Sequence, residues 1–165
     1  MNKIALLNSR QIEQKLKRMA YEIWEQNHNE KEIFIVGIAE AGYILAQNLL
    51  RHLEIISPLK IHLHKMVMDK AHPEKNEDLA IGNSLKAKPV VLVDDVANSG
   101  KTLMYALAPL LKQQPSKIEI AVLVNRHHKN FPIAPDIIGQ SVSTTLQDHI
   151  TVTFKDNQLT GAYLE

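Results

Sequence analysis

The sequence of 165 residues contains no cysteine, which excludes a disulfide framework and any chemistry that needs a thiolate. No apolar run is long enough to span a bilayer, and the apolar stretch at residues 4–7 is too short for a signal peptide. The net charge is only +1, so the overall charge gives no argument for binding to nucleic acid. These absences predict a cytoplasmic protein that does not contact a membrane.

The length suffices for one domain, residues 1–165, with a sizeable core. Apolar residues recur at helical spacing in three segments, 9–27, 41–52 and 101–113. Strand-like runs lie between and after them, at 33–38, 59–66, 90–93, 118–124, 136–138, 151–154 and 162–164. This alternation predicts an α/β fold with a mostly parallel central sheet flanked by helices. A polar stretch broken by proline, about 67–88, predicts a long flexible loop.

The most informative segment is 90–103, Val-Val-Leu-Val-Asp-Asp-Val-Ala-Asn-Ser-Gly-Lys-Thr-Leu. A buried strand runs into two adjacent carboxylates, Asp94 and Asp95, and a loop of small and polar residues then leads into a helix. The amino end of a helix offers free backbone N–H groups and a favourable dipole to a phosphate. Paired acids can hold sugar hydroxyls or Mg²⁺. The combination predicts a site for a sugar phosphate.

Two other phosphate motifs compete with this interpretation. Gly100-Lys101-Thr102 resembles the end of a P-loop, but that motif needs a glycine at position 95, where Asp95 would repel nucleotide phosphates. We therefore exclude it. Residues 37–42 resemble a dinucleotide fingerprint whose middle glycine is replaced, and the stretch 58–61 offers no acid for a ribose. This second alternative stays open.

Segment 90–103 resembles the phosphoribosyl-pyrophosphate motif of type I phosphoribosyltransferases. The N-terminal helix, the strand end Ile-Val-Gly-Ile at 35–38 and the run 121–139 resemble, in this order, the pyrimidine-operon attenuator proteins that are also uracil phosphoribosyltransferases. The resemblance covers nearly the whole chain. It implies a type I phosphoribosyltransferase fold with a small hood at about 131–165. It further implies phosphoribosyl pyrophosphate and a nucleobase or nucleotide as ligands, Mg²⁺ as cofactor, and a homo-oligomer of two or more subunits.

The resemblance also assigns roles by position. Asp94 and Asp95 would be the catalytic and metal-binding residues, holding the ribose hydroxyls directly or through Mg²⁺. The loop around the 5-phosphate would consist of Ala97, Asn98, Ser99, Gly100, Lys101 and Thr102. The loop 37–42 would meet the pyrophosphate through Ala39, Glu40, Ala41 and Gly42, and the hood would contribute Asp136 and Ile137.

The chain departs from the family in two places. Glu40 and Ala41 stand where the family carries Thr-Arg, so an arginine that would neutralise the pyrophosphate is missing. Residues 66–69 replace the family's Tyr-Arg-Asp, which leaves basic residues of the following loop, Lys70 among them, to supply positive charge. Two functions stay open. One is a working phosphoribosyltransferase, which the complete motif at 94–102 favours, and the other is a catalytically weak sensor of phosphoribosyl ligands or nucleotides.

RNA binding is a third possibility. Arg126, His128 and Lys129 form a compact basic cluster in a region that belongs to the basic surface of the attenuator family. Such a cluster can contact phosphates, and that binding would weaken steeply with salt. An exposed turn after a buried strand is the simpler interpretation, and the near-neutral overall charge favours it.

Overall fold

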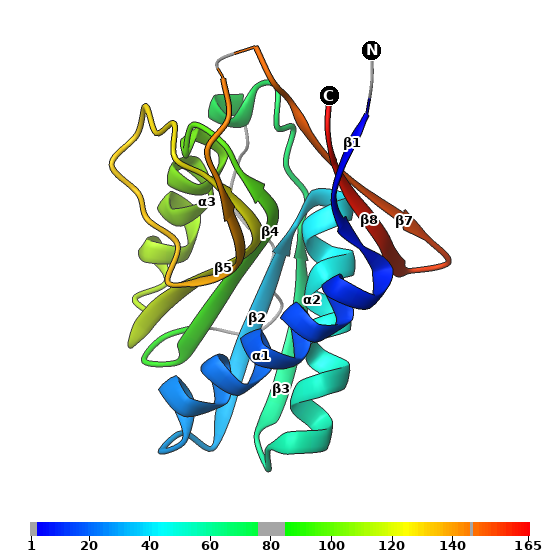
Figure 1. Cartoon of the computed structure of the whole chain (residues 1–165). Coiled ribbons are helices and arrows are strands. Elements are labelled where there is room, and N and C mark those ends of the chain that lie inside the picture. Colours follow the sequence, from blue (N-terminus) through cyan, green and yellow to red (C-terminus); the bar gives the residue numbers. More distant parts are fainter. Residues whose placement is uncertain (1–2, 76–84, 146) are drawn as a thin grey trace.

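The computed structural model describes residues 3–75, 85–145 and 147–165, and its centre is a five-stranded sheet (Figure 1). The strand order is β3-β2-β4-β5-β6, and each neighbouring pair is parallel. The strands are β2 Glu32–Ile38, β3 Lys60–Met66, β4 Pro89–Ala97, β5 Lys117–Arg126 and β6 Ile137–Val142. The chain leaves β2 toward one edge of the sheet and returns on its other side with β4. Ligands of open parallel sheets bind at such a switch point, beyond the carboxyl ends of the strands.

Helices cover both faces of this sheet (Figure 1). They are α1 Ser9–Asn27, α2 Ala39–Ile56 and α3 Lys101–Lys112, with a short 3₁₀ helix, η1, at Pro73–Lys75. Strand side chains alternate between two apolar clusters: Ile33 and Ile35 pack with α1 and α2, whereas Phe34 and Val36 join the cluster that contains α3. The fold class predicted from the sequence is therefore confirmed.

A second, three-stranded antiparallel sheet joins the two ends of the chain, with the order β1-β8-β7. Its strands are β1 Ile4–Asn8, β7 Ile150–Lys155 and β8 Gln158–Leu164. The hood expected at 131–165 is therefore divided, because β6 belongs to the main sheet and only β7 and β8 enter the small one. The sequence patterns also missed β1, whose partner strand lies at the other end of the chain.

The loop expected at 67–88 lies partly outside the described residues, since 76–84 are not among them. The described parts are not simply solvent-exposed, because Met68, Pro73 and Leu85 are buried. In the described part of the chain, no helix is long and apolar enough to cross a membrane.

Candidate active site

The acid pair lies inside β4, because this strand continues to Ala97 rather than ending at Val93. Continued pairing with β5, Val96 to Val124 and Ala97 to Asn125, extends it. The Asp94 side chain is only 2% exposed and that of Asp95 is 15% exposed. Two adjacent carboxylates removed from water need a partner of opposite charge.

Lys70 provides that positive charge. Its ammonium nitrogen lies 2.6 Å from Asp94 Oδ1 and 2.8 Å from Asp95 Oδ1. Burial raises the pKa of Asp94 to about 8, so this carboxyl group holds its proton near neutral pH. Burial opposes ionisation of Asp95 too, but the Lys70 charge and a hydrogen bond from Asp94 lower the pKa of Asp95 overall. The pair therefore carries about one negative charge, matched by one lysine.

A short loop, residues 98–100, connects β4 to α3 and borders a cleft of about 450 Å³. Gly100 has a φ of +85°, a left-handed conformation that glycine adopts without strain, and a Cβ there would lie 2.5 Å from Ile133 Cγ2. The Ser99 hydroxyl accepts a 3.3 Å hydrogen bond from the Lys101 backbone N–H. The N-cap residue of α3 is Gly100, which has no side chain to cap the helix. Backbone N–H groups and the helix dipole thus remain available to an anion at Thr102 and its neighbours.

The end of β5 and the residues that follow it contact this loop. Arg126 donates to the side-chain oxygens of Asn98 and Thr144, both at 2.8 Å, and its side chain is buried. Lys129 donates to Asn125 Oδ1 at 2.8 Å and to the Ala97 carbonyl at 3.3 Å. Arg126 is therefore buried and Lys129 half-buried, and both cations bind neighbouring oxygens, so RNA binding by these two residues stays a prediction.

His128 differs from Arg126 and Lys129 because it is exposed, and its ring nitrogen contacts the Thr144 carbonyl. A contribution of His128 to RNA binding stays a prediction.

The junction between β2 and α2 is tighter than the expected loop 37–42. Gly37 belongs to β2, and α2 begins at Ala39, whose φ of +48° makes the turn within one residue. Gly42 lies in the first turn of α2, where a Cβ would be 2.8 Å from the Val93 carbonyl oxygen and 3.1 Å from Asp94 Cα. This glycine therefore lets α2 pack against the strand that carries the acid pair.

Glu40 is exposed at the same junction, and Ala41 is half-buried. The Glu40 carboxylate forms an ion pair with Lys65 of β3. Lys65 also lies 5.7 Å from the centre of the Tyr43 ring. The negative charge expected to oppose pyrophosphate is thus partly neutralised by a lysine that the sequence patterns did not single out.

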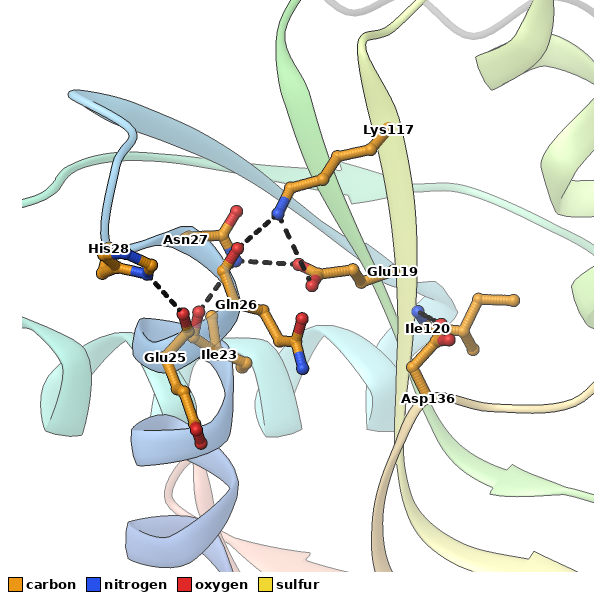
Figure 2. A network of polar contacts seen from close by, with 9 residues as sticks. All are labelled: Ile23, Glu25, Gln26, Asn27, His28, Lys117, Glu119, Ile120 and Asp136. Atoms are coloured by element: carbon orange, nitrogen blue, oxygen red, sulfur yellow. Dashed lines mark hydrogen bonds and ion pairs between the residues drawn. The ribbon is translucent and has the colours of Figure 1, made fainter.

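Asp136 and Ile137 lie away from the cleft, which corrects their expected place in a hood. Asp136 directly precedes β6, and its carboxylate accepts a 2.8 Å hydrogen bond from the Ile120 backbone N–H. Ile137 is the first residue of β6, so Asp136 and Ile137 lie at the amino end of this parallel strand, whereas the cleft lies beyond the carboxyl end of β4. Figure 2 shows this contact beside a network at the end of α1, in which Glu119 binds Asn27 and Lys117.

The cleft also contains residues outside the expected loops, and of these the sequence indicated only Lys70, as a source of positive charge. Lys70 and Ala71 line one part of it, and His149 and Ile150 line another. The last two come from the beginning of the small sheet, where His149 and Glu165 exchange two backbone hydrogen bonds of 2.9 and 2.8 Å. The small sheet, rather than the segment around Asp136, thus reaches the cleft.

Comparisons with known proteins agree with this geometry. Residues 4–157 match the model of the phosphoribosyl transferase domain family. The bifunctional protein PyrR of Brevibacillus brevis is 34% identical over 162 residues, covering 92% of this chain and 89% of that protein. The bifunctional protein PyrR of Fusobacterium nucleatum is 36% identical over 164 residues, covering 92% of this chain and 90% of that protein.

Solved structures show the same fold at lower identity. A hypoxanthine-guanine phosphoribosyltransferase from Bacillus anthracis superposes with a TM-score of 0.72 at 18% identity, covering 84% of this chain and 81% of the other. A hypoxanthine phosphoribosyltransferase from Trypanosoma cruzi gives a TM-score of 0.75 at 14% identity, covering 96% and 90%. With the family match over most of the chain, these findings establish that the chain belongs to the type I phosphoribosyltransferase family and is similar in sequence to the bifunctional PyrR proteins.

Proposed function

We propose that this protein transfers the phosphoribosyl group of phosphoribosyl pyrophosphate to a nucleobase. The observation that carries the proposal is the junction of β4 and α3, where the buried acids Asp94 and Asp95 adjoin the amino end of a helix in one cleft. The acids suit the ribose hydroxyls. The backbone of 97–102 and the hydroxyls of Ser99 and Thr102 suit the 5-phosphate.

The residues present also suit a Mg²⁺ ion. Carboxylate oxygens are its preferred protein ligands, and Asp94 and Asp95 supply them. Within the described residues, no group of three or more His, Asp or Glu side chains is placed to hold a metal, so substrate oxygens and water would complete the coordination. When bound, Mg²⁺ would neutralise charge on the departing pyrophosphate. The remaining catalysis would be positioning of the ribose by the acids and of the phosphate by the loop.

The acceptor we propose is a uracil-like base, because sequence similarity to the PyrR proteins extends over most of the chain. Incubation with phosphoribosyl pyrophosphate, Mg²⁺ and a panel of nucleobases should release pyrophosphate and form a nucleotide with uracil. Asp95→Asn, which keeps the size of the side chain but removes its charge, is the negative control and should lose this activity. Absence of nucleotide and of pyrophosphate release with every base would contradict the proposal.

The second candidate is a catalytically weak sensor that binds phosphoribosyl ligands or nucleotides. Glu40 and Ala41 favour it, because neither supplies a cation to the leaving group and the nearby Lys65 is already paired with Glu40. Binding of nucleoside monophosphates without any turnover would support this candidate.

Oligomerisation and RNA binding, which the family resemblance implies, would be tested by sedimentation and by salt-dependent RNA titration.

A further inference from the structure

The segment 69–75, which follows β3, is folded against the cleft. The Asp69 carboxylate accepts a 2.9 Å hydrogen bond from the Ala71 backbone N–H, and its carbonyl accepts one of 3.2 Å from the His72 N–H. The chain then enters η1, which packs against α3, with Pro73 buried. These local contacts fix a turn that directs Lys70 toward the acid pair.

Two ion pairs join this segment to the site. The segment supplies the cation in one pair and the anion in the other. Lys70 contacts both carboxylates of the acid pair, at 2.6 and 2.8 Å. Glu74 Oε2 lies 3.5 Å from the ammonium of Lys101, the first residue of α3. The segment thus places a cation at the acids and an anion at the Lys101 side chain. A phosphoribosyl ligand with its metal ion would bring charges of the same signs to the same places.

Lys70 lies close to both acids, but its side chain can leave them without a change in the strand that carries them. Asp94 and Asp95 are nearly enclosed, so their oxygens are accessible mainly through the cleft where Lys70 lies. The Lys70 side chain itself is 36% exposed, and its long flexible stem allows the ammonium to leave the acids without rearrangement of β4. An ammonium group and Mg²⁺ repel each other, so close binding of one to the acid pair weakens close binding of the other.

We propose that Lys70 is an internal competitor for the acid pair, which a metal-bound phosphoribosyl ligand must displace. The inference rests on the proposed function for the identity of that ligand. It makes Lys70 a determinant of ligand choice: a ligand that brings both a divalent cation and an anion replaces both ion pairs of the segment. A free phosphate replaces only the contact of Glu74 with Lys101.

The first test compares Lys70→Met with Lys75→Met. Lys75 is exposed in the same segment, and within the described residues it forms no hydrogen bond or ion pair with either acid, so its substitution removes an equal charge nearby. Mn²⁺ is the probe, because it prefers the same oxygen ligands as Mg²⁺ and can be followed by electron paramagnetic resonance. Lys70→Met should bind Mn²⁺ about tenfold more tightly than the parent, and Lys75→Met within about twofold of it.

Lys70→Arg, which keeps the charge, should bind Mn²⁺ like the parent. Equal Mn²⁺ affinity in the parent and Lys70→Met, or weaker binding in Lys70→Met, would overturn the inference.

The second test uses the unaltered protein and does not depend on how a variant folds. Hydrogen exchange at Ala71 and His72 should accelerate when Mg²⁺ and ribose 5-phosphate are added together, because their hydrogen bonds belong to the docked segment. Exchange at Leu92 in β4 is the internal reference. Unchanged or slower exchange at Ala71 and His72 in the bound protein would overturn the inference.

The two proposals fail in different ways. If no variant binds ribose 5-phosphate but Lys70→Met binds Mn²⁺ more tightly, the proposed function is contradicted and the competition stands. If ribose 5-phosphate binds equally to the parent and Lys70→Met with Mg²⁺ present, the competition is contradicted and the proposed function stands.

Discussion

The two strand-to-helix junctions at the carboxyl side of the sheet, β4 to α3 and β2 to α2, differ in the backbone they leave between strand and helix. Three residues, 98–100, separate β4 from α3, whereas α2 begins directly after β2. The first junction can therefore wrap an anion and has buried acids beside it. The second turns within Ala39 and carries the exposed Glu40 in its first helical turn. The two junctions therefore differ in the length of the loop and in the burial of their acidic side chains.

The strongest change that we expect is in the free energy of unfolding, which should depend on pH through Asp94. Because burial raises the pKa of Asp94 from 3.8 to about 8 in the folded protein, its proton stabilises the fold fully below the lower value. This contribution is lost as the pH rises toward the upper one. Urea unfolding of the parent and of Asp94→Asn from pH 4 to 8 should show the parent losing stability relative to the variant, by at most about 1.4 kcal/mol per pH unit. If the free energy of unfolding changed equally with pH in both proteins, a buried and protonated Asp94 would be contradicted.

The next effect separates the junctions by charge. Asp95→Asn should weaken ribose 5-phosphate binding about 10- to 100-fold, because it removes a charged hydrogen-bond acceptor from the cleft. Glu40→Gln removes the same charge at the other junction, where the side chain is exposed and paired with Lys65. It should change this affinity by no more than about twofold. Calorimetric titration measures both, and similar losses in the two variants would mean that the junctions are not specialised.

Two glycines test the backbone difference. Gly42→Ala should destabilise the protein by about 1–3 kcal/mol, because the new methyl group meets the Val93 carbonyl oxygen and the backbone of Asp94. Gly100→Ala places an alanine in the left-handed backbone conformation of this loop, which is strained for a residue with a side chain. It should therefore weaken phosphate binding more than Gly42→Ala does. Thermal unfolding and ribose 5-phosphate titration of both variants check this. The reverse ranking for phosphate binding would place the anion at β2–α2.

The smallest effect would add function to the second junction. Ala41→Arg supplies a cation at a half-buried position in the first turn of α2 and should raise pyrophosphate affinity about three- to tenfold. Ala41→Gln is the control of similar length without the charge. No difference between the two variants in a pyrophosphate titration would show that this helix end does not face the leaving group.

The sequence predicted the β4–α3 junction because its features are local. The apolar run, the acids, Gly100 and the following helical stripe determine a strand, a turn and a helix within 14 residues of contiguous chain, 90–103. Only the end of β4 was placed wrongly, since pairing with β5 carries the strand past the acids to Ala97.

The misplaced residues depend on contacts between distant segments. Asp136 looked like part of a hood, but parallel pairing of β6 with β5 sets it at the far side of the sheet. Arg126 looked exposed, but Asn98 and Thr144 enclose it from separate loops. β1 is defined by pairing such as Ile4 with Leu164, and the Lys70 contact by the fold of 69–75. None of these pairings has a signal in local periodicity.

A titration shows whether the β4–α3 junction is a site for ribose 5-phosphate. Ribose 5-phosphate and ribose are each titrated into the protein with Mg²⁺, and the measurement is repeated with Thr102→Ala. We expect ribose 5-phosphate to bind at least about tenfold more tightly than ribose, and Thr102→Ala to narrow this difference in affinity. Equal affinity for the two sugars, or no binding of ribose 5-phosphate, would contradict a phosphate site at this junction.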